Sequence, residues 1–386
     1  MREIELLKSD PGTLGDFCGA KEEKFVDMLK SLKMPSKEVE HYRYFDMEYL
    51  LSKNYYLIDK KSSRSAENSN RLVFENGYLK EAPKEFISRS GFSAQEHFDP
   101  VYPLSHLLSC ERVSLEIDRD VTLEVSHVNT LKGALGAYRI SLRIKSGAKV
   151  LIKERFEGEK GSGSLILFGW DVDIQEGSLE FVTISEPKSE GAVFVGSHYI
   201  RADKESFTGY RSYALGSGTV ANIALIELEK SSRCEASHLV FAMERASVAN
   251  ITKIVHKKSD AATRQKSRHV LKDKAQAVFD ALVRVEKDAE GASVHQENRT
   301  VLLNDGAYMV AKPQLEIYID ELEASHGSTT GQIDPQELFY IRSRGIEELK
   351  AKKLIITGFV NELIQEAPKE CIEEIGVAFE RLFATE

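Results

Sequence analysis

Short apolar runs with a strand-like pattern fill the middle of the chain, from about residue 113 to residue 325. In one of them, Leu315, Ile317 and Ile319 alternate with charged or aromatic residues, which predicts a strand with one buried face. Other runs, such as residues 278–285, are apolar at almost every position, and this favours strands that are covered on both faces. The pattern therefore predicts a mainly β protein.

Small residues recur where these predicted strands begin. Signatures that start with Gly or Ala occur at positions 147, 177, 218, 246, 275 and 306, so the successive steps are 30, 41, 28, 29 and 31 residues. A repeat of about thirty residues without helices is typical of a β-solenoid, in which each coil covers the inner face of the next. We interpret the longer step as one insertion near residues 185–210. A β-sandwich with fortuitous spacing is the alternative.

Helical patterns flank the β-rich region on both sides. Apolar residues recur at helical spacing within residues 21–53, and a polar segment at 59–70 has the composition of a linker. Near the other end, Asp334 can cap a helix that begins with Pro335. The sequence thus predicts an N-terminal helical region with linker at 1–75, a solenoid core at 76–325 and a C-terminal helical domain at 326–386.

Composition and charge exclude several classes of protein. The chain has 61 acidic and 52 basic residues, for a formal net charge of -9, so overall charge disfavours a nucleic-acid partner. No secretory signal and no apolar run of about 18 residues is present, which indicates a cytoplasmic protein. Cysteines occur at 18, 110, 234 and 371 without a CxxC pair, which argues against a disulfide framework or a structural zinc site.

The sequence contains few candidates for chemistry of its own. It has no P-loop, HExxH or GxSxG motif. Asp171 and Asp173 lie two residues apart in a strand-like run, a spacing that would suit carbohydrate chemistry or metal binding, although exposed charges on a solenoid coil are the commoner explanation. His326 follows a predicted strand and precedes a helix start. It is a candidate metal ligand, although a lone histidine beside a strand end is more commonly a structural residue with satisfied hydrogen bonds.

Residues 312–346, KPQLEIYIDELEASHGSTTGQIDPQELFYIRSRGI, resemble the C-terminal core of the SufB/SufD family of iron–sulfur cluster assembly proteins. The SHG and TGQ motifs around His326 are similar to the SufD branch rather than to SufB. Weaker similarity extends back to about His256, and residues 35–44 resemble a segment near the family's N-terminus. The resemblance implies a right-handed parallel β-helix, or solenoid, flanked by N-terminal and C-terminal helical regions.

The resemblance also implies a function. It predicts a non-catalytic scaffold subunit of a SufBCD-type complex, with a SufB-like subunit and a SufC-type ABC ATPase as partners, or a homodimer when isolated. No cofactor would be stably bound, but a transient Fe–S cluster could form at the subunit interface with His326 as candidate ligand. Many SufD sequences have Cys where this chain has Ala324, so that thiolate is lacking here.

The resemblance assigns partner contacts to two parts of the chain. Residues 315–325, in the last strands of the solenoid, would meet the SufB-like subunit. Residues 335–345 and the two helices beyond them would meet the ATPase. The predicted contact residues are Leu315, Ile317, Ile319, Pro335, Leu338, Phe339, Tyr340, Arg342, Arg344 and Gly345.

Two other functions fit parts of the same pattern. A carbohydrate-active β-helix enzyme is one, although the chain has one tryptophan and no signal peptide. A SufB-like homodimeric scaffold is the other, although the expected cysteine pattern of SufB is absent around residues 324–328.

Overall fold

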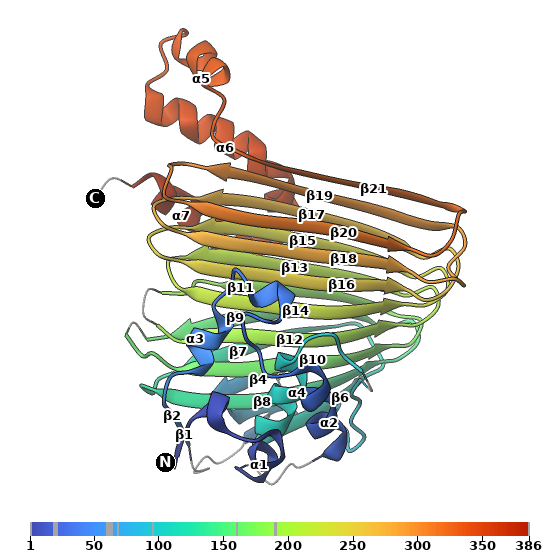
Figure 1. The fold of residues 1–386 in the computed structure, drawn as a ribbon. Coiled ribbons are helices and arrows are strands. Elements are labelled where there is room, and N and C mark those ends of the chain that lie inside the picture. The colour runs from blue at the N-terminus through green and yellow to red at the C-terminus, as the bar shows by residue number, and fades with distance from the viewer. Residues whose placement is uncertain are drawn as a thin grey trace.

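Two long β-sheets dominate the computed structural model, which describes residues 2–17, 22–58, 65–67, 69–94, 96–159, 161–188 and 191–384. From residue 165 onward, successive strands alternate between the sheets, and their pairings are parallel (Figure 1). Each coil therefore adds one strand to each sheet, and the predicted β-solenoid is confirmed.

The strands of the ten-stranded sheet, in spatial order, are β1 (Arg2–Ile4), β2 (Tyr55–Leu57), β8 (Ala134–Ile144), β10 (Leu165–Ile174), β12 (Val193–Ala202), β14 (Thr219–Leu228), β16 (Ser247–His256), β18 (Gln276–Val285) and β20 (Tyr308–Ile317), with β6 (Glu111–Ile117) beside β8. Those of the eleven-stranded sheet are β21 (Leu322–Gly331), β19 (Ala292–Leu302), β17 (Ala262–Leu271), β15 (Arg233–Ala242), β13 (Phe207–Gly216), β11 (Ser178–Ser185), β9 (Lys149–Gly158), β7 (Val121–Asn129), β4 (Arg71–Glu75), β5 (Tyr78–Pro83) and β3 (Ser65–Glu67).

The register corrects one expectation from the repeat analysis. Ser178 pairs with Phe207 in the next coil, a step of ordinary length, so the insertion expected near residues 185–210 does not exist. The small-residue signatures at 147 and 177 precede β9 and β11 of one sheet, whereas those from 218 onward precede β14, β16, β18 and β20 of the other. The 41-residue step is therefore a change from one sheet to the other.

Helices cover the outer face of each sheet. Most of them belong to the two ends of the chain, where the sequence predicts helices, but the helix at residues 101–108 lies within the predicted solenoid core. The helices are α1 (Pro11–Leu14), α2 (Glu23–Leu32), α3 (Met47–Leu51), α4 (Val101–Leu108), α5 (Pro335–Arg342), α6 (Glu348–Gln365) and α7 (Lys369–Phe383). The N-terminal helices share an apolar core with β8, β10 and β12. Helices α6 and α7 bury Ile356, Val360 and Ile375 against the outer face of β11, β13, β15 and β17.

The expected boundaries at 75/76 and 325/326 differ from the ends of the observed elements. Strand β4 lies within residues 1–75, yet it pairs with β7 of the solenoid. Strand β21 runs from Leu322 to Gly331, because it continues the ladder of β19. The last coil therefore extends beyond residue 325 and includes His326.

Asp171 and Asp173 are buried, which corrects the expectation of exposed charges on a coil. Asp171 accepts a hydrogen bond from Arg139 Nη2 at 2.9 Å, and Asp173 accepts one from Arg201 Nη2 at 2.7 Å. Burial opposes the charged form, but Arg139 and His106 hold the pKa of Asp171 well below its usual range. Both carboxylates thus pair with arginines, so these two aspartates no longer support a carbohydrate-active site.

Replacing Arg139 by methionine is expected to destabilise the protein by about 3–5 kcal/mol, because Asp171 would keep a buried charge without its partner. Urea unfolding at pH 7.5 measures the change. Arg143→Met is the matched control, with an expected loss below about 1 kcal/mol, since Arg201 would still pair with Asp173. Equal losses in the two variants would show that the Arg139 pair has no special weight.

Candidate functional site at the open end of the solenoid

The last coil of the solenoid lacks a cover. Strands β20 and β21 are the final strands of their sheets, and within the described chain each forms its ladder with a single neighbour, β18 or β19. Helices α6 and α7 lie along one outer face instead of across this end, and α5 stands beyond it (Figure 1). The outer edges of β20 and β21 therefore present backbone N–H and C=O groups that can pair with another chain.

The inner face of the last coil is also partly uncovered. Leu315 and Ile319 are half-buried against the main core, as the period-two pattern predicts. Ile317 stacks in register on the fully buried Val285 of the preceding coil, yet 40% of its surface is exposed. Ile317 faces inward but is exposed because no further coil covers it. A second solenoid stacked on this end would bury it.

His326 lies inside strand β21, in register with Gln296 of β19, and it is exposed. The sequence predicts that His326 follows a strand, and this prediction is wrong because residues 322–331 form a full ladder with β19. Ala324, two residues before it, pairs with Val294 and can supply no ligand. Among the described residues, no three His, Cys, Asp or Glu side chains are grouped to hold a metal ion.

The cysteines that the structure describes add no thiolate ligand to this end. Cys234 and Cys371 are buried, and burial raises the pKa of the Cys234 thiol to about 12. Cys110 is disulfide-bonded, which the dispersed spacing did not predict, and Cys18 lies outside the described residues. A metal at His326 would therefore need most of its ligands from another chain.

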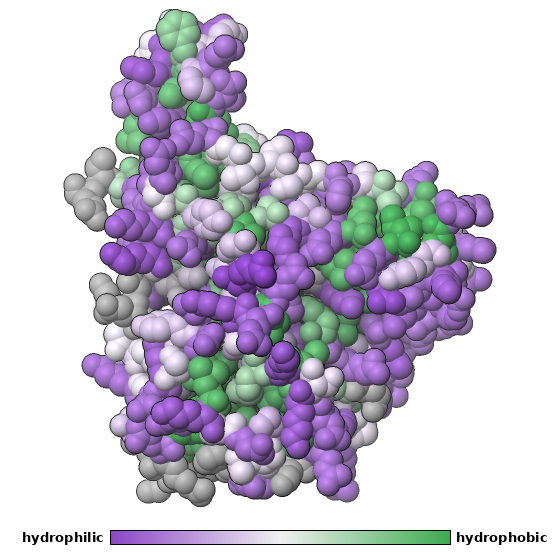
Figure 2. All heavy atoms as spheres, viewed as in Figure 1, coloured by the Kyte–Doolittle hydropathy of each residue, from purple (hydrophilic) through white to green (hydrophobic). Residues whose placement is uncertain are grey.

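Helix α5 begins as the sequence predicts and projects its side chains into solvent. Asp334 Oδ1 accepts a hydrogen bond from the Gln336 N–H at 2.8 Å, and Pro335 occupies the first turn. The helix buries none of its residues: Phe339 is 73% exposed and Tyr340 60%. Hydrophobic atoms are visible at the tip of the molecule in the region of α5 (Figure 2).

Cationic side chains flank these aromatic rings. Arg344 stacks on the Tyr340 ring, with its guanidinium carbon 3.6 Å from the ring centroid, and Arg342 pairs with Glu348 at 3.1 Å. Gly345 has a φ of 82°, a conformation that favours glycine, and it redirects the chain towards α6.

A groove of about 690 Å³ lies where α5 leaves the solenoid. Its apolar lining comes from the last coils and from the C-terminal helices, and the residues are Leu302, Leu303, Ile333, Pro335, Leu338, Leu349, Leu382 and Phe383. The predicted contacts Pro335 and Leu338 therefore belong to one apolar surface, next to the exposed face of α5.

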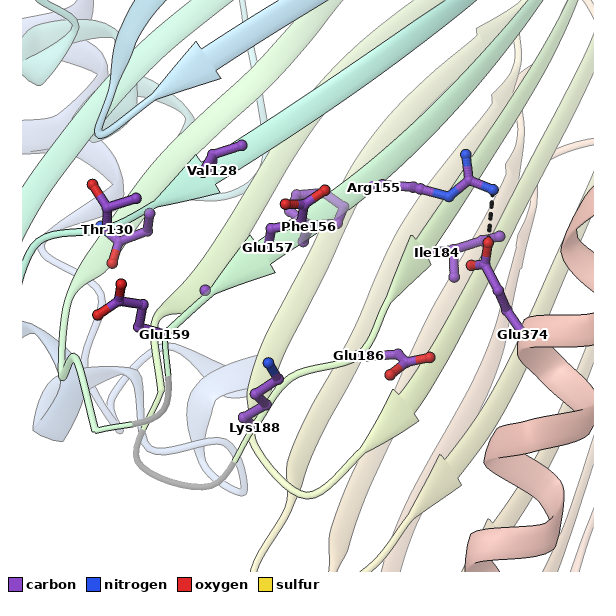
Figure 3. A pocket seen from close by; sticks show the side chains of 12 residues that line it. Val128, Thr130, Arg155, Phe156, Glu157, Glu159, Ile184, Glu186, Lys188 and Glu374 are labelled. Carbon is purple, nitrogen blue, oxygen red and sulfur yellow. Dashed lines mark hydrogen bonds and ion pairs between the residues drawn. The ribbon is translucent and has the colours of Figure 1, made fainter.

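A second hollow, of about 440 Å³, lies between the ends of β7 and β9 and helix α7 (Figure 3). Arg155 Nη2 donates a hydrogen bond to Glu374 at 2.8 Å across it. Its lining is formed by charged, polar and apolar side chains and contains no Ser, Cys or His. None of the predicted site residues lies there.

No helix in the described part of the chain is long and apolar enough to cross a membrane. The fold and the uncovered end together define a β-solenoid protein whose two sheets each end at an open edge. The sequence matches the family described as "SUF system FeS cluster assembly, SufBD core domain" over residues 127–359. This match covers more than half of the chain, and the chain belongs to that family.

Individual relatives support a protein of the SufD type with a role in iron–sulfur cluster assembly. The "Iron-sulfur cluster assembly protein SufD" of Escherichia coli K12 is 23% identical over 382 residues, which cover 91% of this chain and 90% of the relative. SufD of Bacillus subtilis is 35% identical over 105 residues, 27% of this chain and 24% of the relative. The chloroplastic protein ABCI7 of Arabidopsis thaliana is 24% identical over 245 residues, 61% of this chain and 50% of the relative.

Proposed function

We propose that the chain is a non-catalytic scaffold subunit that assembles and transfers iron–sulfur clusters together with a SufB-like subunit and a SufC-type ABC ATPase. The observation that carries the proposal is the open last coil, in which both sheets end at unpaired edges. Family membership supplies the kind of cargo. The resident machinery for ATP hydrolysis would belong to the ATPase partner.

The open end suits a second solenoid better than an unrelated surface. A partner built on the same core domain would bring two strands at the same separation, so the ladders of β20 and β21 could both continue across the interface. The half-buried Leu315 and Ile319 and the exposed Ile317 would then be covered. Backbone pairing of two strands together with apolar burial accounts for a specific contact with a SufB-like subunit.

Helix α5 suits the ATPase contact because it offers the residue types that dominate binding energy. Phe339 and Tyr340 are exposed aromatic side chains, and Arg344 is held over the Tyr340 ring. Aromatic residues and arginine are enriched among interface residues whose removal costs the most affinity. The groove lined by Pro335 and Leu338 extends this surface.

The cluster itself is the cargo, and His326 would be one of its ligands. A neutral imidazole binds iron less strongly than a thiolate does, so its bond can be given up when the cluster is transferred. Since Ala324 supplies no thiolate and no metal-binding cluster exists among the described residues, the remaining ligands would come from the partner's side of the interface.

Replacing His326 by alanine in the co-expressed complex is expected to lower the iron and sulfide bound per complex by on the order of tenfold. Iron and acid-labile sulfide are quantified after anaerobic purification. His295→Ala is the matched control, because His295 is also exposed on the neighbouring strand but faces Ser325. Normal cluster content in the His326→Ala complex would sink the ligand role.

A further inference from the structure

A buried amide lies directly beneath His326. Gln296 of β19 pairs in register with His326 in the next coil and with Gln265 in the preceding one. Its side chain is 0% exposed, and its Nε2 donates to the carbonyl oxygen of Ala281 on the opposite sheet at 3.2 Å. Gln296 therefore points between the sheets. Residues in register on parallel strands project to the same face, so His326 occupies the next place in this inner column.

Hydrogen bonds determine which way the Gln296 amide faces. Gln265 Nε2 donates to Thr252 Oγ1 at 2.7 Å, which leaves Gln265 Oε1 as the acceptor for Gln296 Nε2 at 3.1 Å. Because Gln296 Nε2 donates to both Gln265 and Ala281, its Oε1 has to face elsewhere. That oxygen is buried and accepts no hydrogen bond from the described chain. A buried carbonyl oxygen without a donor is costly, so a donor is expected beside it.

We infer that Gln296 is a positioning residue for His326. A neutral imidazole carries one N–H donor and one lone pair, on different ring nitrogens. If His326 donates its N–H to Gln296 Oε1, the carbonyl gains its missing donor and the lone pair of the other nitrogen faces outward from the open end. Proteins orient metal-binding histidines by such a bond to the second ring nitrogen.

This inference rests on the proposed function, because only that function makes the outward ring nitrogen of His326 a ligand for the cluster's iron. The inference adds a positioning role for Gln296, which lies one coil further inside the solenoid than His326. It also accounts for a row of hydrogen-bonded polar side chains, Thr252, Gln265 and Gln296, that leads through the solenoid interior to the strand that bears His326.

Asn298 provides a matched comparison on the same strand. It is buried like Gln296 and lies two residues further along β19, where it pairs in register with Ser328 instead of His326. Its Nδ2 donates to Ser328 Oγ at 3.1 Å. Replacing Asn298 by leucine therefore removes a buried amide from the same coil without removing the acceptor proposed for His326.

The test uses the full-length chain labelled with ¹⁵N-histidine, without iron, at a pH where His326 is neutral. Long-range ¹H–¹⁵N spectra report which ring nitrogen carries the proton, and the signals missing from His326→Ala assign the residue. One tautomer should dominate in the unsubstituted chain. In Gln296→Met the second tautomer should appear and exchange of the ring N–H with water should be at least tenfold faster. Gln296→Asn should be intermediate, and Asn298→Leu should match the unsubstituted chain.

Identical His326 signals in Gln296→Met and the unsubstituted chain would overturn the inference, and so would an equal change in Asn298→Leu. Should Gln296→Met fail to fold, Gln296→Asn alone decides the question. The tautomer is measured without a cluster, so its outcome is separate from the ligand test: normal cluster content in His326→Ala would remove the ligand role and leave the tautomer result standing.

Discussion

Replacing Phe339 and Tyr340 together by alanine is expected to abolish measurable binding of the SufC-type ATPase. Both rings are largely exposed on a helix that buries none of its residues. Removing them should therefore change the free energy of unfolding very little. Anchoring aromatic residues contribute about 2 kcal/mol or more each to an interface. Losing two of them would raise the dissociation constant by about a thousandfold.

Isothermal titration of the ATPase into the purified chain measures this loss. Tyr49→Ala is the control, because Tyr49 is a comparably exposed tyrosine on α3, far along the chain from α5. The free energy of unfolding of the double variant should stay within about 0.5 kcal/mol of the original. An unchanged dissociation constant would exclude α5 as the ATPase contact.

Acid should destabilise the protein steeply between pH 6.5 and pH 4. Burial is the main cause of lowered pKa values in six histidines, to about 4 for His97, His198, His238 and His256 and to about 3 for His106 and His269. In the unfolded chain each would titrate near pH 6.5. Between those values the unfolded state binds more protons, so the stability from these groups is complete above pH 6.5 and is lost as pH falls.

The expected slope is large because the six groups act together. Each contributes about 1.4 kcal/mol per pH unit within its window, which gives up to about 8 kcal/mol per pH unit in all. A domain of ordinary stability, about 5–15 kcal/mol, would unfold within about two units below pH 6.5.

Urea midpoints at pH 7.5, 6.5, 6.0 and 5.5 measure this slope. His256→Asn should reduce the slope by about one sixth, since His256 is one of the six histidines. Its Nε2 is hydrogen-bonded to the Thr263 hydroxyl at 2.7 Å. A midpoint that stays constant from pH 7.5 to pH 5.5 would contradict the predicted proton uptake.

The solenoid and the start of α5 could be predicted because their signals are local. Alternation and small residues mark the strands, and the Asp334–Pro335 pair marks the helix. The extent of the last strand could not be predicted in this way. The inward positions of β21 carry Ala324, His326 and Ser328, so the apolar alternation that reveals other strands is missing, and only the ladder with β19 shows that this segment is a strand.

Contacts between residues on neighbouring coils could not be predicted from the sequence either. Asp171 and Arg139 are on neighbouring strands but 32 positions apart, and no local pattern joins them. The same holds for Gln296, which the sequence shows only as one polar residue within HQEN. Its register with His326 and its buried carbonyl oxygen become apparent only when the coils are stacked.

The pairing role of the open end is tested most directly by native mass spectrometry of this chain co-expressed with the SufB-like and SufC-type proteins of the same organism. We predict one complex that contains all three proteins, and loss of the SufB-like subunit when Ile317, exposed at the open end, is replaced by lysine. A SufB-like protein and ATPase that associate with each other while this chain remains a separate monomer or homodimer would contradict the proposed scaffold.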